Sequence, residues 1–178
     1  MSQELNAHDN SPSIKWRKQT VGAFLLFHLL LPLALIPYCF SWYGVIAVFL
    51  GNYLFCSLGI GLCYHRALCH GSLRLNRGVE RILALFGICS LQDSPCHWVA
   101  LHRAHHQYSD DEGDPHSPLK SFFWGHLGWL LIKRSDMKRK DLYQKYVPDL
   151  LQDPFYAGLE KHLLWVWIFV AHAGLFFL

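Results

Sequence analysis

The chain has 178 residues, of which 52% are hydrophobic and only 16% are charged. Soluble domains usually carry about 25% charged residues, so this composition excludes an ordinary soluble domain. A disordered chain is excluded as well, because 15% of the residues are aromatic. The net charge of +3 indicates no nucleic-acid partner, and the unusual feature of the composition is its 12 His residues.

The first 14 residues are polar and contain no apolar core of a cleavable signal, so residues 1–14 are expected to form a short disordered tail. Residues 15–178 are expected to form one membrane domain. Between Lys18 and Arg66 there is no charged residue over about 47 positions, whereas one membrane crossing needs about 20. The apolar stretches 21–40 and 43–63 therefore predict a transmembrane helical hairpin.

Positive charge flanks this hairpin on both sides and is absent from its connecting loop. The flanking basic residues are Lys15, Arg17, Lys18, Arg66, Arg74, Arg77 and Arg81. Because basic residues favour the cytosolic side, the N-terminus and the His-rich segments after the hairpin are expected there. The apolar stretch 163–178 is expected to begin a third transmembrane helix. The predicted fold class is an all-α polytopic membrane protein with a transmembrane hairpin and cytosolic His-bearing helices.

The segment HRAHH carries His102, His105 and His106, which share one face if the segment is helical. Three adjacent imidazoles have no structural purpose, whereas His is the commonest metal ligand near neutral pH. The alternative is a polar surface with histidines placed by chance. The pattern therefore favours a metal site.

The segment HRALCH carries His65 and His70, which follow the second apolar stretch directly. Residues five apart lie about 140° apart on a straight α-helix, so the two rings converge only if the helix ends or kinks between them. Gly71 permits such an end. Imidazole ligands suit Fe, Cu, Ni or Zn, and five His are too many for one tetrahedral zinc ion, so two metals sharing them is the simplest interpretation.

Several other residues lie near these motifs. Asp110, Asp114 and His116 are candidates to orient the ligand imidazoles, with a solvated acidic turn as the alternative. His97 and the remaining histidines are expected to be structural or interfacial. Sequence signatures of di-iron carboxylate bundles, zinc proteases, serine hydrolases and nucleotide-binding folds are all absent.

Three segments in this order resemble the membrane fatty-acid desaturases, and the stearoyl-CoA or Δ9 acyl-lipid branch most closely. They are HRALCH (65–70), WVALHRAHHQYSDDEGDPHSP (98–118) and FFWGHLGWLL (122–131). The resemblance implies an oxidoreductase of lipid metabolism that inserts a cis double bond, at Δ9, into a saturated acyl chain. It implies two non-haem iron ions (Fe²⁺), O₂ as co-substrate, and electrons from a carrier of the cytochrome b5 or ferredoxin type.

The resemblance also implies roles for individual residues. The iron ligands would be His65, His70, His102, His105 and His106. Trp98 would line the substrate site, and Lys133 and Arg134 would contact the phosphate-bearing headgroup of an acyl-CoA or acyl-lipid substrate. No catalytic residue is expected beyond the metal site.

Two departures from the family pattern bear on function. The third histidine box of the family is absent from these residues, so the chain is expected to be an N-terminal portion with part of the ligand set. Ala100 and Leu101 stand where animal acyl-CoA enzymes have Arg and Asp, which leaves acyl-lipid substrates open. The alternatives are a His-box hydroxylase or monooxygenase, and an inactive metal-binding membrane remnant.

Overall fold

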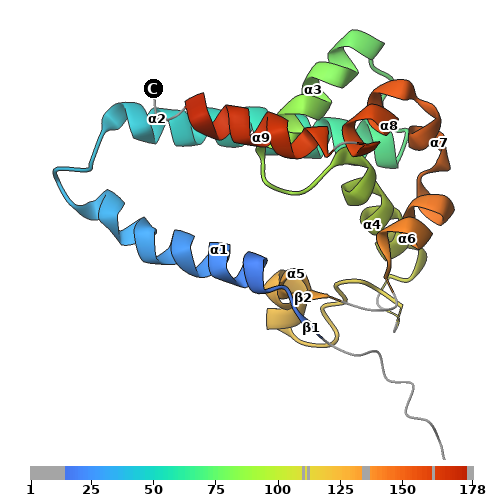
Figure 1. Ribbon diagram of the computed structural model, residues 1–178, viewed down its shortest axis with the longest axis horizontal. Helices are drawn as coiled ribbons and strands as arrows, with labels where there is room; N and C mark the ends of the chain where they lie inside the picture. Colours follow the sequence, from blue (N-terminus) through green and yellow to red (C-terminus); the bar gives the residue numbers. More distant parts are fainter. Residues whose placement is uncertain (1–14, 110, 112, 134–136, 162, 176–178) are drawn as a thin grey trace, which may run out of the picture.

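The computed structural model describes residues 15–175 apart from 110, 112, 134–136 and 162. The predicted tail, residues 1–14, lies outside the described residues, so its disorder stays a prediction. The described part is almost entirely helical, in agreement with the predicted all-α fold (Figure 1). Its only strands are β1 (Lys15–Trp16) and β2 (Ile132–Lys133), which pair antiparallel with Lys15 opposite Lys133.

The two apolar stretches form two helices joined by a short turn. Helix α1 (Lys18–Leu30) continues as the 3₁₀-helix η1 (Leu31–Leu35), and α2 (Trp42–Gly51) continues as the π-helix η2 (Asn52–Cys69). Both continuous helices, Lys18–Leu35 and Trp42–Cys69, are long and apolar enough to cross a membrane. They meet at the turn and diverge from it (Figure 1). The first has no buried residue, as expected of side chains that face lipid.

Helix α3 (Arg77–Cys89) runs back along η2 and packs tightly against it. Its buried face is formed by Leu83, Ala84, Gly87 and Ile88. A Cβ atom added to Gly59 of η2 would lie 2.4 Å from the backbone nitrogen of Gly87, so the two backbones meet directly. Small residues permit this close approach between helices.

The second His-rich segment lies on α4 (Pro95–Gln107), which begins at the N-cap Ser94. A loop then leads to the π-turn η3 (Trp124–Gly128) and the short α5 (Trp129–Leu131). The chain finishes with α6 (Arg139–Tyr146), α7 (Pro148–Gln152), α8 (Pro154–Lys161) and α9 (Leu164–Leu175). Helices α4, α6, α7 and α8 gather at the end of the molecule opposite the turn between α1 and α2 (Figure 1).

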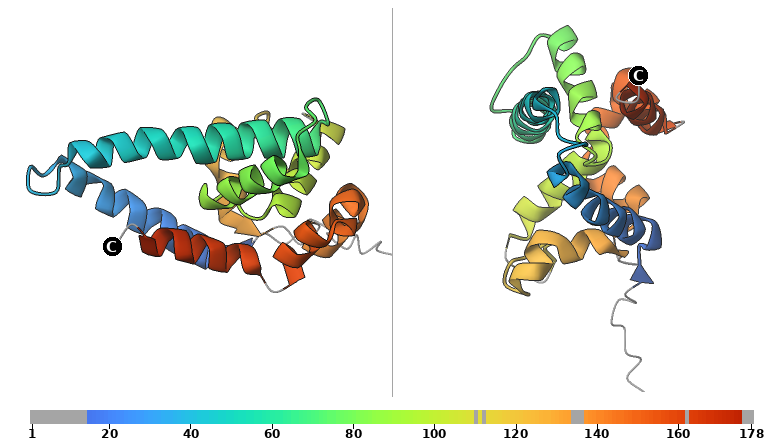
Figure 2. Two further views of the ribbon diagram at one scale, coloured as in Figure 1. Left: turned by 90° about the horizontal axis from the view of Figure 1, so that it is seen from above. Right: turned by 90° about the vertical axis from the view of Figure 1, so that its left-hand side faces the viewer.

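Helix α9 packs against α3 and α8, and in the end-on view α3 lies between η2 and α9 (Figure 2). Its 12 residues are fewer than the roughly 20 that a membrane crossing needs. Residues 176–178 lie outside the described residues. The third transmembrane helix predicted over 163–178 therefore stays a prediction.

Candidate metal centre

Four histidines from two helices converge at the end of η2. They are His65 of η2, His70 as the C-cap directly after η2, and His102 and His106 of α4. One ligand nitrogen from each lies within 4.8 Å of all the others. The Nε2 atoms of His65 and His70 are 3.1 Å apart, and those of His102 and His106 are also 3.1 Å apart. Two nitrogens that share a metal ion at about 2.0–2.1 Å and near-right or tetrahedral angles lie about 3 Å from each other. The four imidazoles therefore fit a single metal ion.

The π-helical winding of η2 brings His65 and His70 together. In a π-helix each N–H bonds to the carbonyl five residues earlier, and His70 N donates to His65 O at 3.1 Å. Residues i and i+5 then lie on nearly the same face. The helix ends at Cys69, between the two rings, as expected from the sequence, and the π-winding before this end was not expected. Gly71 does follow in the left-handed conformation, with φ of 58°, just after the helix ends.

The rings on α4 are held in the neutral state that binds metal. Burial and the neighbouring imidazoles, His106 foremost, lower the pKa of His102 to about 3. Burial, His70 and His105 likewise lower the pKa of His106. Neutral imidazole nitrogens carry the free lone pair that a metal ion requires.

His105 points to a second group of side chains. Its Nδ1 lies 3.0 Å from both carboxylate oxygens of Asp114, which is fully buried, and its ring stacks on that of His116 at 4.2 Å. Asp114 also accepts a hydrogen bond from the His116 backbone N–H at 2.9 Å. The three imidazoles of HRAHH thus belong to two groups. His102 and His106 are part of the four-His group, whereas His105 contacts Asp114 and His116.

The carboxylate of Asp114 decides which nitrogen of His105 is available. A carboxylate that accepts the Nδ1–H fixes the tautomer whose Nε2 carries the lone pair. Burial and His105 lower the pKa of His116 despite the nearby carboxylate, so this ring is neutral as well. The arrangement leaves Nε2 of His105 as a further nitrogen ligand, with its ring centroid 5.4 Å from that of His106.

A pocket of about 470 Å³ adjoins the four-His group. Trp98 stacks on His102, with ring centroids 4.8 Å apart, and its indole N–H donates to Gln92 at 3.1 Å. Further lining residues include Arg17, Leu101, His116, Trp129 and Trp165. Trp98 therefore lies beside the candidate metal centre and lines a largely apolar cavity, and its role in substrate binding stays a prediction.

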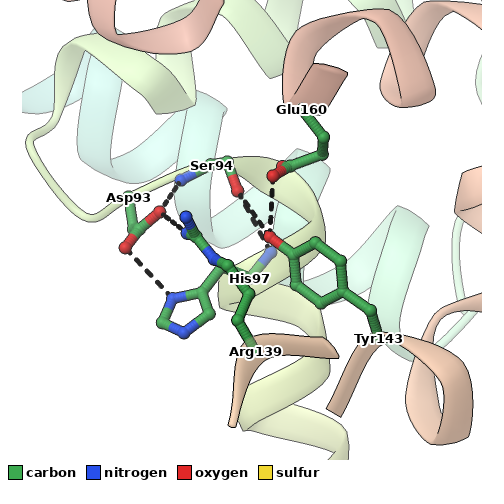
Figure 3. A network of polar contacts seen from close by, with 6 residues as sticks. All are labelled: Asp93, Ser94, His97, Arg139, Tyr143 and Glu160. Carbon is green, nitrogen blue, oxygen red and sulfur yellow. Dashed lines mark hydrogen bonds and ion pairs between the residues drawn. The ribbon is translucent and has the colours of Figure 1, made fainter. Parts of the chain in front are cut away.

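Asp93 and His97 line this pocket and belong to a polar network that the sequence did not reveal (Figure 3). Asp93 lies 3.1 Å from His97 Nδ1 and forms an ion pair with Arg139 of α6. Burial alone would raise the pKa of Asp93, but His97 and Arg139 outweigh it and hold this pKa well below its ordinary range. Asp93 has a left-handed φ of 75°, and such backbone strain in a non-glycine residue is typical of functional sites.

Other predicted site residues are not part of the four-His group. Lys133 is exposed on β2, opposite Lys15, while Asp110 and Arg134 lie outside the described residues. His97 lines the pocket, which its sequence context gave no reason to expect. Asp93 and Arg139 are 46 residues apart, so no local pattern signals their contact.

The chain is similar to known proteins over most of its length. The sequence profile of the family described as fatty acid desaturase matches residues 40–178. The chain is 41% identical over 157 residues to a sn-2 palmitoyl-lipid 9-desaturase of Nostoc sp. (strain 36), covering 87% of this chain and 53% of the relative. It is 34% identical over 165 residues to a sn-1 stearoyl-lipid 9-desaturase of Anabaena variabilis, covering 91% and 58%.

A third relative acts on a different carrier. An icosanoyl-CoA 5-desaturase of Limnanthes douglasii is 38% identical over 154 residues, which cover 83% of this chain and 42% of the relative. The chain spans about half the length of the curated relatives it matches.

Proposed function

Because the chain belongs to the fatty acid desaturase family, we propose that it forms the part of an acyl-lipid 9-desaturase that carries the first two histidine boxes. The observation that carries this proposal is the convergence of four imidazole nitrogens within 4.8 Å. They lie where the second of two helices long enough to span a membrane ends beside the His-bearing helix α4. The relatives named as lipid 9-desaturases support an acyl-lipid substrate and a cis double bond at Δ9.

Two non-haem iron ions are proposed as the cofactor. His65, His70, His102 and His106 would hold one iron, and His105 would offer its Nε2 to the other. When bound, the iron pair supplies, with O₂ and two electrons, the oxidising power that removes two hydrogens from an unactivated acyl chain. The protein contributes neutral imidazoles at fixed positions, with Asp114 orienting His105.

The substrate would lie in the pocket beside Trp98. An acyl chain suits a cavity with apolar walls, and Trp98 and Leu101 would hold it next to the four-His group and exclude water. Arg17 lines the same pocket, and it could hold an anionic headgroup by charge and by its planar guanidinium. Lys133 and Arg134 are proposed to add positive charge to this headgroup region.

The proposed orientation places the N-terminus and the histidine boxes on the cytosolic side of the membrane. The support is the basic flanks of the hairpin, because the connecting loop carries none. An electron carrier of the cytochrome b5 or ferredoxin type would then reach the exposed side of the metal centre, where His70 and His106 lie at the surface.

The metal site can be tested by binding alone. The chain, purified in lipid nanodiscs, is titrated with Co²⁺, whose visible absorption reports nitrogen ligation. We expect stoichiometric binding that His102→Ala abolishes. His126→Ala is the matched control, because this exposed histidine stacks only on Phe122. Unchanged binding by His102→Ala would refute the ligand assignment.

The reaction is tested on the protein as its source cell produces it. Lipids from cells that express it are analysed by mass spectrometry against cells that express the His102→Ala variant. Desaturation predicts acyl chains two hydrogens lighter at the Δ9 position. A gain of oxygen in the acyl chain would establish a hydroxylase or monooxygenase instead, and unaltered lipids would favour a metal-binding remnant.

A further inference from the structure

Arg103 stands between two of the proposed iron ligands and forms an unusually complete set of hydrogen bonds. Its Nη1 donates to Tyr146 O at 2.6 Å and to Asp149 Oδ1 at 2.8 Å. Its Nη2 donates to Leu68 O at 2.7 Å and to Asp149 Oδ2 at 2.9 Å. The two bonds to Asp149 are the parallel, bidentate arrangement that makes an Arg–carboxylate pair strong and geometrically specific.

The two backbone acceptors both lie at helix ends. Leu68 lies in the last turn of η2, between His65 and His70, and Tyr146 is the last residue of α6. The last carbonyls of a helix lack partners within the helix, and the partial negative charge of a helix C-terminus attracts a cation. Arg103 of α4 therefore caps the C-terminal end of η2. It links the helix of His102 and His106 to the helix end at which His65 and His70 lie.

Asp149 completes this arrangement in two ways. Its carboxylate holds the guanidinium plane in one orientation, so both backbone bonds form without further loss of side-chain freedom. Its negative charge also balances the positive charge of Arg103, so a cation bound to the four-His group would lie near a pair with no net charge. Consistent with this coupling, the hydrogen bonds that Arg103 donates to Asp149 raise the pKa of Arg103, although burial opposes them.

We propose that Arg103 and Asp149 are a positioning pair that holds the two halves of the four-His group at metal-binding distance. One half is His65 and His70 at the C-terminal end of η2, and the other is His102 and His106 on α4. Neither member of the pair touches the metal. This inference rests on the metal site proposed above and adds residues that the spacing of the histidines does not reveal.

The test compares Co²⁺ affinity among variants of the whole chain in nanodiscs. Arg103→Lys keeps the charge but loses the planar fork, and Asp149→Asn keeps the shape but loses the charge. We expect each to weaken Co²⁺ binding about 10- to 100-fold, the usual effect of removing a partner that orients ligands. The visible absorption bands of bound Co²⁺ should shift as well, because the nitrogens no longer meet at the same angles.

A second Arg–Asp ion pair in the same protein supplies the control. Arg81 of α3 binds Asp153 at 3.3 Å and lies over the ring of Phe155, 5.1 Å from its centroid. Arg81→Lys and Asp153→Asn should leave the Co²⁺ affinity and the absorption bands unchanged. If these controls weaken binding as much as the Arg103 and Asp149 variants do, the effect is general destabilisation and the proposal fails.

Two further outcomes separate this inference from the proposed function. Wild-type affinity and spectra in both Arg103→Lys and Asp149→Asn would overturn the positioning pair while leaving the metal site intact. A wild-type chain that binds no Co²⁺ would overturn the metal site itself. If Arg103→Lys does not fold, Asp149→Asn still tests the proposal. In Asp149→Asn, Arg103 is present and can still donate to both backbone carbonyls, so this variant is expected to fold.

Discussion

Replacing Gly59 with Ala tests the backbone contact that fixes η2 against α3. An ideal Cβ at this position would lie 2.4 Å from Gly87 N and 2.7 Å from Gly87 Cα. Ordinary contact begins at 3.4 Å, so α3 would have to move by 3.4 − 2.4 = 1.0 Å. Backbone atoms cannot rotate aside as a side chain can. Overpacking of this kind costs about 1–3 kcal/mol of the free energy of unfolding.

The matched control is Gly22→Ala on α1, where an added Cβ would meet nothing within 4 Å. Both variants gain the higher helix propensity of Ala, about 1 kcal/mol, so their difference isolates the steric term. Reversible unfolding in mixed detergent micelles should therefore place Gly59→Ala about 1–3 kcal/mol below Gly22→Ala. Because His65 lies on the same helix, Co²⁺ affinity should fall too. Equal stability of the two variants would refute the close packing of η2 on α3.

Three further predictions follow from other contacts. The depressed pKa of Asp93 contributes stability that is present above the pKa of the unfolded carboxyl, about 4, and is lost progressively as the pH falls from there toward the pKa of the folded carboxyl. Asp93→Asn should flatten this part of the profile of unfolding temperature against pH. Leu101→Trp should fill the pocket and weaken binding of a radiolabelled palmitoyl lipid about 5- to 150-fold. Tyr156→Phe removes a 2.9 Å hydrogen bond to Glu80 and should lower the free energy of unfolding by about 1.5–3 kcal/mol.

Each of these predictions has an outcome that contradicts it. An Asp93→Asn profile as steep as that of the wild type would mean that another carboxyl dominates the acid range. Leu119 is 74% exposed, so Leu119→Trp should leave lipid binding unchanged, and an equal effect of the two Trp variants would exclude the pocket. A Tyr156→Phe variant within about 0.5 kcal/mol of wild type would show that the Glu80 contact adds no net stability.

The elements that depend on local properties could be read from the sequence. Apolar runs without charge dictate long helices wherever backbone groups leave water, and both helices formed, with Ser41 as the N-cap of the second. Residues three or four apart share a helix face, so the juxtaposition of His102 and His106 also followed from spacing. The motif order was specific enough to identify the family, because it reflects which residue types the chemistry requires.

Only the tertiary structure decided how the histidines are divided and what holds them. The π-winding of η2 pairs His65 with His70, and no spacing rule for an ordinary helix predicts it. His105 pairs with the carboxylate of Asp114 and not with its neighbours on α4, because a buried charge requires a hydrogen-bond partner. The pairing of Arg103 with Asp149 joins residues 46 positions apart. Such contacts arise where separate helices pack, so local sequence determines the ligand types while packing determines the geometry in which they meet.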